Sequence, residues 1–128
     1  PDIGAAAQQG YVYYYEGLFE SLHAEGLPIV AYGAQSGGYF TKLANGGEVP
    51  EALNARYANP ANQARLTAAK ALAERHGVSI NEIVMSYLTS QPNQTVPIFG
   101  GNSPEQIEDS VKAAALVLSA DELAQLRG

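Results

Sequence analysis

Two short apolar runs, each ending in a glycine-rich turn, constrain the fold of this chain more than any other feature. Residues 27–32 (LPIVAY) are followed by Gly33, and residues 95–99 (TVPIF) are followed by Gly100 and Gly101. Short continuous apolar runs bounded by glycine are typical of strands that are buried on both faces in a parallel sheet. The sequence therefore predicts two strands of this kind.

Helix-boundary signals divide most of the remaining chain. Ser79 with Glu82 forms a capping box, and glycines at positions 26 and 77 can end helices in the left-handed conformation. Helices are expected over residues 16–25, from Pro60 to a stop at Gly77, from the Ser79 capping box to an end before Pro92, after Ser103 and after Ser119. The helix from Pro60 has a small-residue face of Ala64, Ala68, Ala71 and Leu72. A further strand is expected at Tyr11–Tyr15, and a long loop from Gly33 to Asn59. This alternation indicates an α/β protein with a parallel sheet.

The overall charge excludes some functions. The chain has 13 acidic and 7 basic side chains and a net charge of -6, which opposes the phosphate-neutralising surface of a nucleic-acid-binding protein. It has no cysteine, and His23 and His76 are too isolated to suggest a metal site. No apolar stretch approaches the ~18 residues of a membrane span, so a soluble protein is expected, and the absence of cysteine fits a cytoplasmic location.

The two strand ends are candidate ligand sites. In parallel α/β folds, ligands bind outside the carboxyl ends of strands, where helix N-termini attract anions. Gly33, Gly37 and Gly38 permit close backbone approach, and Ser36, Asn102 and Ser103 offer polar contacts to phosphate oxygens. The alternative is that these turns only connect secondary structure elements.

Two sequence blocks resemble a known family. PIVAY at residues 28–32 followed by Gln35-Ser36-x-Gly38, and VPIFGGNSPEQIEDS at 96–110 with LSADEL at 118–123, are similar to the C-terminal part of aldo-keto reductases. The resemblance implies a (β/α)8 TIM-type barrel, in which parallel strands lie inside a ring of helices and these blocks form the seventh and eighth units. Residues 1–128 would be a single partial-barrel domain, with 1–26 as a strand and helix lead-in and 27–127 matching the family.

The resemblance also implies a site for a nicotinamide nucleotide. Tyr32 corresponds to the aromatic residue that stacks on the nicotinamide ring, and the turn from Gly33 to Gly38 corresponds to the loop that contacts the pyrophosphate. Residues between 100 and 110 correspond to those around the adenosine. The expected cofactor-binding residues are Tyr32, Gly33, Gln35, Ser36, Gly38, Gly100, Asn102, Ser103, Gln106, Asp109 and Ser110.

Two departures from the family pattern affect the choice of cofactor. Members that use NADPH usually carry Lys or Arg where this chain has Gly100 or Gln106, and Ser110 replaces a common Asn. A neutral glutamine pairs poorly with a 2'-phosphate. NAD is therefore slightly favoured over NADP.

The resemblance implies an incomplete catalytic apparatus. The family's catalytic Asp, Tyr, Lys and His belong to the first half of the barrel, and no motif in these 128 residues matches them. The expected function is the cofactor-binding part of an NAD(P)-dependent oxidoreductase that reduces aldehydes or ketones, without catalytic residues of its own and inactive alone. One alternative is a noncatalytic half-barrel that binds a nucleotide phosphate or only self-assembles, as a homo-oligomer or with an N-terminal half. Another alternative is a partner-binding module that uses the Tyr11–Tyr15 cluster.

Overall fold

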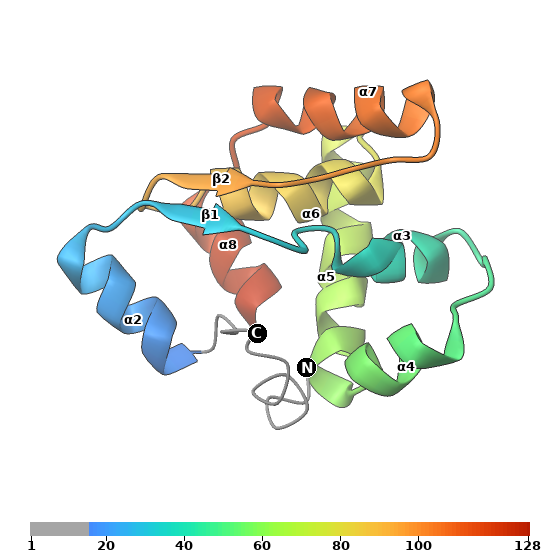
Figure 1. Ribbon diagram of the computed structural model, residues 1–128, viewed down its shortest axis with the longest axis horizontal. Coiled ribbons are helices and arrows are strands. Elements are labelled where there is room, and N and C mark those ends of the chain that lie inside the picture. The colour runs from blue at the N-terminus through green and yellow to red at the C-terminus, as the bar shows by residue number, and fades with distance from the viewer. Residues whose placement is uncertain (1–15) are drawn as a thin grey trace.

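The computed structural model describes residues 16–128, so the strand expected at Tyr11–Tyr15 lies outside the described residues (Figure 1). Its elements are α2 (Glu16–Glu25), β1 (Ile29–Ala31), the 3-10 turn η1 (Ser36–Gly38), α3 (Tyr39–Ala44), α4 (Glu51–Tyr57), α5 (Pro60–His76), α6 (Ile80–Thr89), β2 (Thr95–Pro97), α7 (Pro104–Lys112), η2 (Ala113–Ala115) and α8 (Ala120–Arg127). In this part of the chain, no helix is long and apolar enough to cross a membrane.

The expected helix boundaries are confirmed, and local hydrogen bonds explain them. Asn59 caps α5 by accepting a hydrogen bond from the Asn62 amide at 2.8 Å, and Gly77 ends the helix with a φ of +67°. Ser79 and Glu82 form the expected capping box at the start of α6. These caps satisfy backbone groups that a helix end leaves without partners.

The two expected strands pair in parallel. Ile29 lies opposite Thr95, Val30 opposite Val96 and Ala31 opposite Pro97. Figure 1 shows β1 and β2 side by side, with α6 along one side of β2 and α7 above it. The carboxyl ends of both strands therefore meet at the same edge of the sheet.

The expectation that both strands are buried on both faces is wrong for one face. Val30 and Tyr32 on β1 and its extension are 66% and 79% exposed, and Val96 and Ile98 beside them are each 49% exposed. The opposite face, with Ala31 and Pro97, is partly covered by helices. The two described strands have a helical layer on one side only, which leaves the apolar residues of the other side in solvent.

The connection expected to be one long loop contains two helices. Tyr39 in α3 is 4% exposed, and its ring lies 5.4 Å from that of Phe40 and 5.5 Å from that of Tyr57 in α4. Burial of these aromatic rings stabilises short helices that have little propensity signal of their own. Gly38 precedes α3 and Gly46 follows its end, whereas α4 begins after Pro50 and ends before Ala58.

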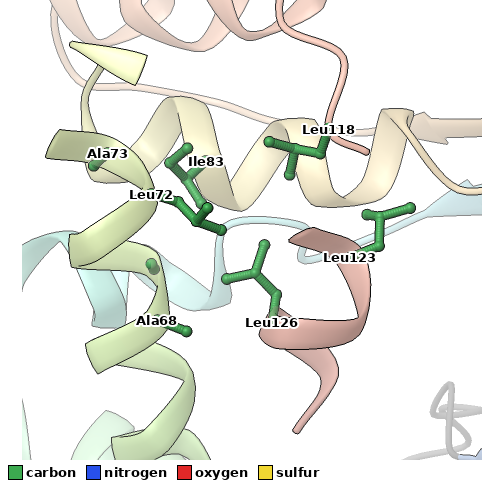
Figure 2. Packing of buried hydrophobic residues seen from close by; sticks show 8 residues of the cluster. Ala68, Leu72, Ala73, Ile83, Leu118, Leu123 and Leu126 are labelled. Carbon is green, nitrogen blue, oxygen red and sulfur yellow. The ribbon is translucent and has the colours of Figure 1, made fainter. Parts of the chain in front are cut away.

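The main core lies between α5, α6 and α8 (Figure 2). Leu72 and Ile83 are fully buried, and Leu118, Leu123 and Leu126 complete the cluster with Ala68, Ala69 and Ala73. The small-residue face of α5 was predicted only in part, because Ala64 and Ala71 are exposed. Alanines occur on all sides of α5, so the positions of the larger leucines decide which face is buried.

Candidate functional site

The turn after β1 has an unusual backbone. Ser36 has a φ of +51°, and Gly33, Gly37 and Gly38 also have positive φ angles. A left-handed conformation at a serine costs on the order of 1 kcal/mol and is found preferentially at functional sites. Hydrogen bonds from the Ser36 amide to the Gly33 carbonyl at 2.9 Å and from the Gly38 amide to the Gln35 carbonyl at 2.8 Å hold the turn.

A lysine that no pattern in the sequence singles out belongs to this turn. Lys42 Nζ donates a hydrogen bond to the Gly37 carbonyl oxygen at 2.8 Å. A Cβ atom added to Gly38 would lie 2.8 Å from the same nitrogen. The ammonium group therefore lies against the turn because α3 places residue 42 one helical turn beyond Gly38. Its position could have been predicted only if the helix at 39–44 had been recognised.

The turn after β2 leads directly into α7. The Gln106 side chain folds back, and its Oε1 accepts a hydrogen bond from the Asn102 amide at 2.8 Å. Ser103 Oγ caps the helix by accepting from the Gln106 amide at 3.4 Å. A Cβ at Gly101 would lie 2.9 Å from the Gln106 Cβ, so the turn and the first turn of α7 are in close contact.

The two turns are joined by Gln35. Its Oε1 accepts a hydrogen bond from the Gly100 amide at 3.3 Å. Its Nε2 donates to Asn81 Oδ1 on α6 and to Ser110 Oγ on α7, both at 3.1 Å. The structure therefore brings together the two loops that the sequence placed far apart.

Several predicted site residues have side chains that are hydrogen-bonded within the protein. Asp109 Oδ2 accepts from Ser79 Oγ at 3.0 Å and from Asn81 Nδ2 at 2.9 Å. Ser110 is 3% exposed, and its hydroxyl donates to the Gln106 carbonyl at 2.9 Å. Asn81 was not selected from the sequence, because only the fold places it beside residues 35 and 110.

Other predicted residues lie at the open edge of the sheet. Tyr32, Gly33, Gly100 and Asn102 are exposed, whereas Ser36, Gly38 and Ser103 are partly buried. A Cβ at Gly33 or Gly100 would meet no atom within 4 Å, so the backbone is accessible at both turns. The eleven predicted residues thus form one continuous region, and their contact with a cofactor remains a prediction.

The charges of the region are unevenly distributed. Lys42 contributes a cation at the turn after β1, whereas no Lys or Arg occurs between residues 98 and 111. A hydrogen bond from Ser103 lowers the pKa of Glu105, so this carboxylate at the start of α7 stays ionised. Lys112 at the end of α7 pairs with Glu108 at 3.3 Å. The region around α7 is therefore neutral to acidic.

Comparisons with known proteins agree on one family. The model for the aldo/keto reductase family matches residues 6–128. Protein tas of Escherichia coli (strain K12) is 27% identical over 117 residues, covering 86% of this chain and 34% of that protein. Aldo-keto reductase ausK of Emericella nidulans is 28% identical over 142 residues, covering 94% of this chain and 36% of that protein. The chain spans about a third of the length of these relatives.

A solved structure supports the fold. The crystal structure of the thermostable aldo-keto reductase Tm1743 with the inhibitor epalrestat matches with a TM-score of 0.60 and 22% sequence identity. The match covers 87% of this chain and 32% of that chain. The expected fold class, part of a (β/α)8 barrel with parallel strands and outer helices, is confirmed.

Proposed function

Because the chain belongs to the aldo/keto reductase family, we propose that it supplies the nucleotide-binding part of an NAD(P)-dependent oxidoreductase that reduces aldehydes or ketones. The observation that carries this proposal is the contact between the two strand-end turns through the Gln35–Gly100 hydrogen bond. This contact joins two distant segments at the end of the parallel sheet, which is where nucleotides bind in α/β folds.

Each turn suits a different part of the nucleotide. The open backbone at Gly33 and the left-handed turn at Ser36 fit a pyrophosphate, to which Lys42 adds a positive charge. The exposed ring of Tyr32 at the end of β1 would cover one face of the nicotinamide. When bound, the nicotinamide supplies the hydride that reduces the carbonyl carbon. The residues of this chain bind and orient the nucleotide, while the proton donor belongs to the rest of a complete barrel.

The charges around α7 favour NAD(H) over NADP(H). The Gln106 side chain is turned toward the Asn102 amide, and the carboxylates of Glu105 and Asp109 lie nearby on the same helix. A 2'-phosphate brought here would meet negative charges without a basic partner from residues 98–111. The ribose hydroxyls of NAD(H) carry no charge and avoid this repulsion.

Direct titration tests the proposal. NADH and NADPH are titrated into the chain and binding is followed by calorimetry, with Tyr32→Leu as the test variant and Val117→Ala as the control. Val117 is also 79% exposed but follows η2, away from the two turns. We expect NADH binding that Tyr32→Leu weakens about fivefold and Val117→Ala leaves unchanged. Absence of binding of both nucleotides at millimolar concentration would refute the proposal.

The exposed apolar face favours a second candidate, a noncatalytic half-barrel that self-assembles. Val30 and Val96 lie side by side on this face. A hollow of about 300 Å³ opens on the opposite face, lined by Thr89 and Ser110 and by the apolar side chains of Met85, Pro97, Phe99, Val111, Ala113 and Ala114. Exposed apolar patches and unpaired strand edges drive association. Light scattering at micromolar concentration together with the NADH titration separates the candidates. Association without nucleotide binding supports the second one.

A further inference from the structure

We propose that Asn81 is a positioning residue that couples the two turns of the candidate site. Asn81 lies at the start of α6, outside both turns, and is only 7% exposed. Its side chain is hydrogen-bonded to Gln35 in one turn and to Asp109 and Ser110 on α7. That this coupling serves nucleotide binding rests on the proposed function, whereas the coupling itself can be tested separately.

The carboxylate of Asp109 sets the direction of the Asn81 and Gln35 hydrogen bonds in this cluster. An ionised carboxylate only accepts, so the Asn81 Nδ2 group must face Asp109 Oδ2 at 2.9 Å. Asn81 Oδ1 then faces the other way and accepts from Gln35 Nε2 at 3.1 Å. This orientation turns Gln35 Oε1 toward the Gly100 amide at 3.3 Å. A fixed sequence of donors and acceptors thus runs from α7 through α6 to both turns.

Ser79, at the N-terminus of α6, also holds the Asp109 side chain in place. Ser79 Oγ donates to Asp109 Oδ2 at 3.0 Å while it accepts from the Glu82 amide at 3.0 Å. Asn81 Nδ2 donates further to Ser110 Oγ at 3.0 Å. Because Ser79 and Glu82 already cap α6, the Asn81 side chain is not needed for capping. Its hydrogen bonds are instead all directed to residues outside α6.

Loss of the Asn81 side chain should therefore release Gln35. Gln35 Nε2 would retain only its bond to Ser110, and the Gly100 amide would lose an oriented acceptor. The hydrogen bond of a single amide changes an equilibrium by about two- to tenfold. We expect that change at both turns, while the core between α5, α6 and α8 stays intact.

Amide hydrogen exchange measured by NMR on the whole chain tests the coupling. In Asn81→Ala, the exchange of the Gly100 amide and of the Gln35 side-chain amide should accelerate about two- to tenfold relative to the amide of Leu72 in the core. The control is Asn54→Ala, at an exposed asparagine on α4, which should change neither. Equal acceleration at Leu72 and Gly100, or no change at Gly100, would overturn the proposal.

Exchanging the amide and carboxylate groups of Asn81 and Asp109 tests the same hydrogen-bond directions without removing side-chain volume. Asn81→Asp places a second carboxylate against Asp109, so both groups can only accept and the cluster should open as in Asn81→Ala. Adding Asp109→Asn supplies a donor opposite the new acceptor and should recover at least half of the lost protection at Gly100. A double variant with no more protection than Asn81→Asp would overturn the proposed orientation.

Nucleotide titration then separates this inference from the proposed function. If the wild-type chain binds NADH, Asn81→Ala and Asn81→Asp should each raise the Kd about two- to tenfold. The double variant of Asn81→Asp and Asp109→Asn should bind NADH more tightly than Asn81→Asp alone. An unchanged Kd in Asn81→Ala would overturn the positioning role. Failure of the wild-type chain to bind NADH would overturn the proposed function, while the exchange measurements still decide whether Asn81 couples the turns.

Discussion

Replacing Glu122 by glutamine tests the electrostatic link between α8 and α5. Glu122 Oε2 accepts hydrogen bonds from the Ser119 amide at 2.9 Å and from Ser119 Oγ at 3.0 Å. Glu122 Oε1 lies 2.7 Å from His76 Nε2 and 3.5 Å from an Arg75 nitrogen at the end of α5. With a side chain only 12% exposed, Glu122 joins the ends of two helices that share the core.

The size of the effect follows from the pKa of Glu122. Hydrogen bonds from the Ser119 backbone amide and from His76 lower this pKa from 4.5 to about 2. At about 1.4 kcal/mol for each pKa unit, the shift corresponds to at most about 3.5 kcal/mol of folding free energy. Solvent near the ion pair screens part of this, so we expect about 1–2 kcal/mol. Glutamine still accepts the Ser119 amide bond, so Glu122→Gln should lose mainly this ionic part.

The contribution of Glu122 should depend on pH with a definite sign. Its pKa in the folded state lies below that of the unfolded chain, so the folded state favours the carboxylate form. The stabilisation is therefore complete above about pH 4.5 and disappears as the pH falls toward about 2. The difference in unfolding free energy between wild type and Glu122→Gln should narrow over the same range.

Urea unfolding followed by circular dichroism at pH 7, 4 and 2.5 measures this difference. Glu82→Gln is the matched control, because Glu82 closes the other capping box through a 2.7 Å bond from the Ser79 amide. Glutamine preserves that box as well, so the control reports the cost of the amide substitution alone. A Glu122→Gln variant as stable as wild type at pH 7, or a difference that persists at pH 2.5, would refute the reasoning.

Four further substitutions, one of them a control, probe the core and the site. Leu72→Ala should lower the unfolding free energy by about 2–5 kcal/mol in urea titrations, because this fully buried side chain fills the centre of the core; a loss below 1 kcal/mol would contradict its placement. Gly38→Ala and Gly46→Ala both strain a residue with a positive φ, but only at Gly38 would the new Cβ displace Lys42 Nζ. Calorimetry should therefore find weaker NADH binding for Gly38→Ala than for Gly46→Ala. Equal Kd values for the two variants would argue against a ligand at that turn. Gln106→Arg should shift the preference toward NADPH by about 1–3 kcal/mol in competing titrations, and a hundredfold preference of the wild type for NADPH would contradict the charge argument.

The helices could be predicted because their signals are local. Asn59, Ser79, Ser103 and Ser119 each cap a helix through a hydrogen bond three residues along the chain, and such pairs are visible in the sequence. The turns after the two strands were also recognisable by their glycines, of which Gly33, Gly37 and Gly38 have positive φ angles and Gly101 lies in close contact with Gln106. These features depend on neighbours in the sequence rather than on the tertiary fold.

The features that were missed depend on distant contacts. The helices at 39–44 and 51–57 form because Tyr39 packs against Tyr57, which no local periodicity indicates. Gln35 and Ser110 were among the predicted site residues but Asn81 was not, because these three polar side chains meet only when β1, α6 and α7 are assembled. Exposure of one sheet face was missed for the same reason, since it depends on which layers surround the strands.

The pairing of β1 with β2 has a consequence for the order of folding. Ile29 must find Thr95 across all of α3 to α6, and closing so long a loop is slow and entropically unfavourable. By contrast, α5 and α6 are adjacent in sequence and share the core around Leu72. The nucleus should therefore form in this helical pair, with the strands joining late. Until the strands pair, their backbone N–H and C=O groups are available to strands of other chains. The refolding yield therefore depends on the relative rates of β1–β2 pairing within one chain and of strand pairing between chains.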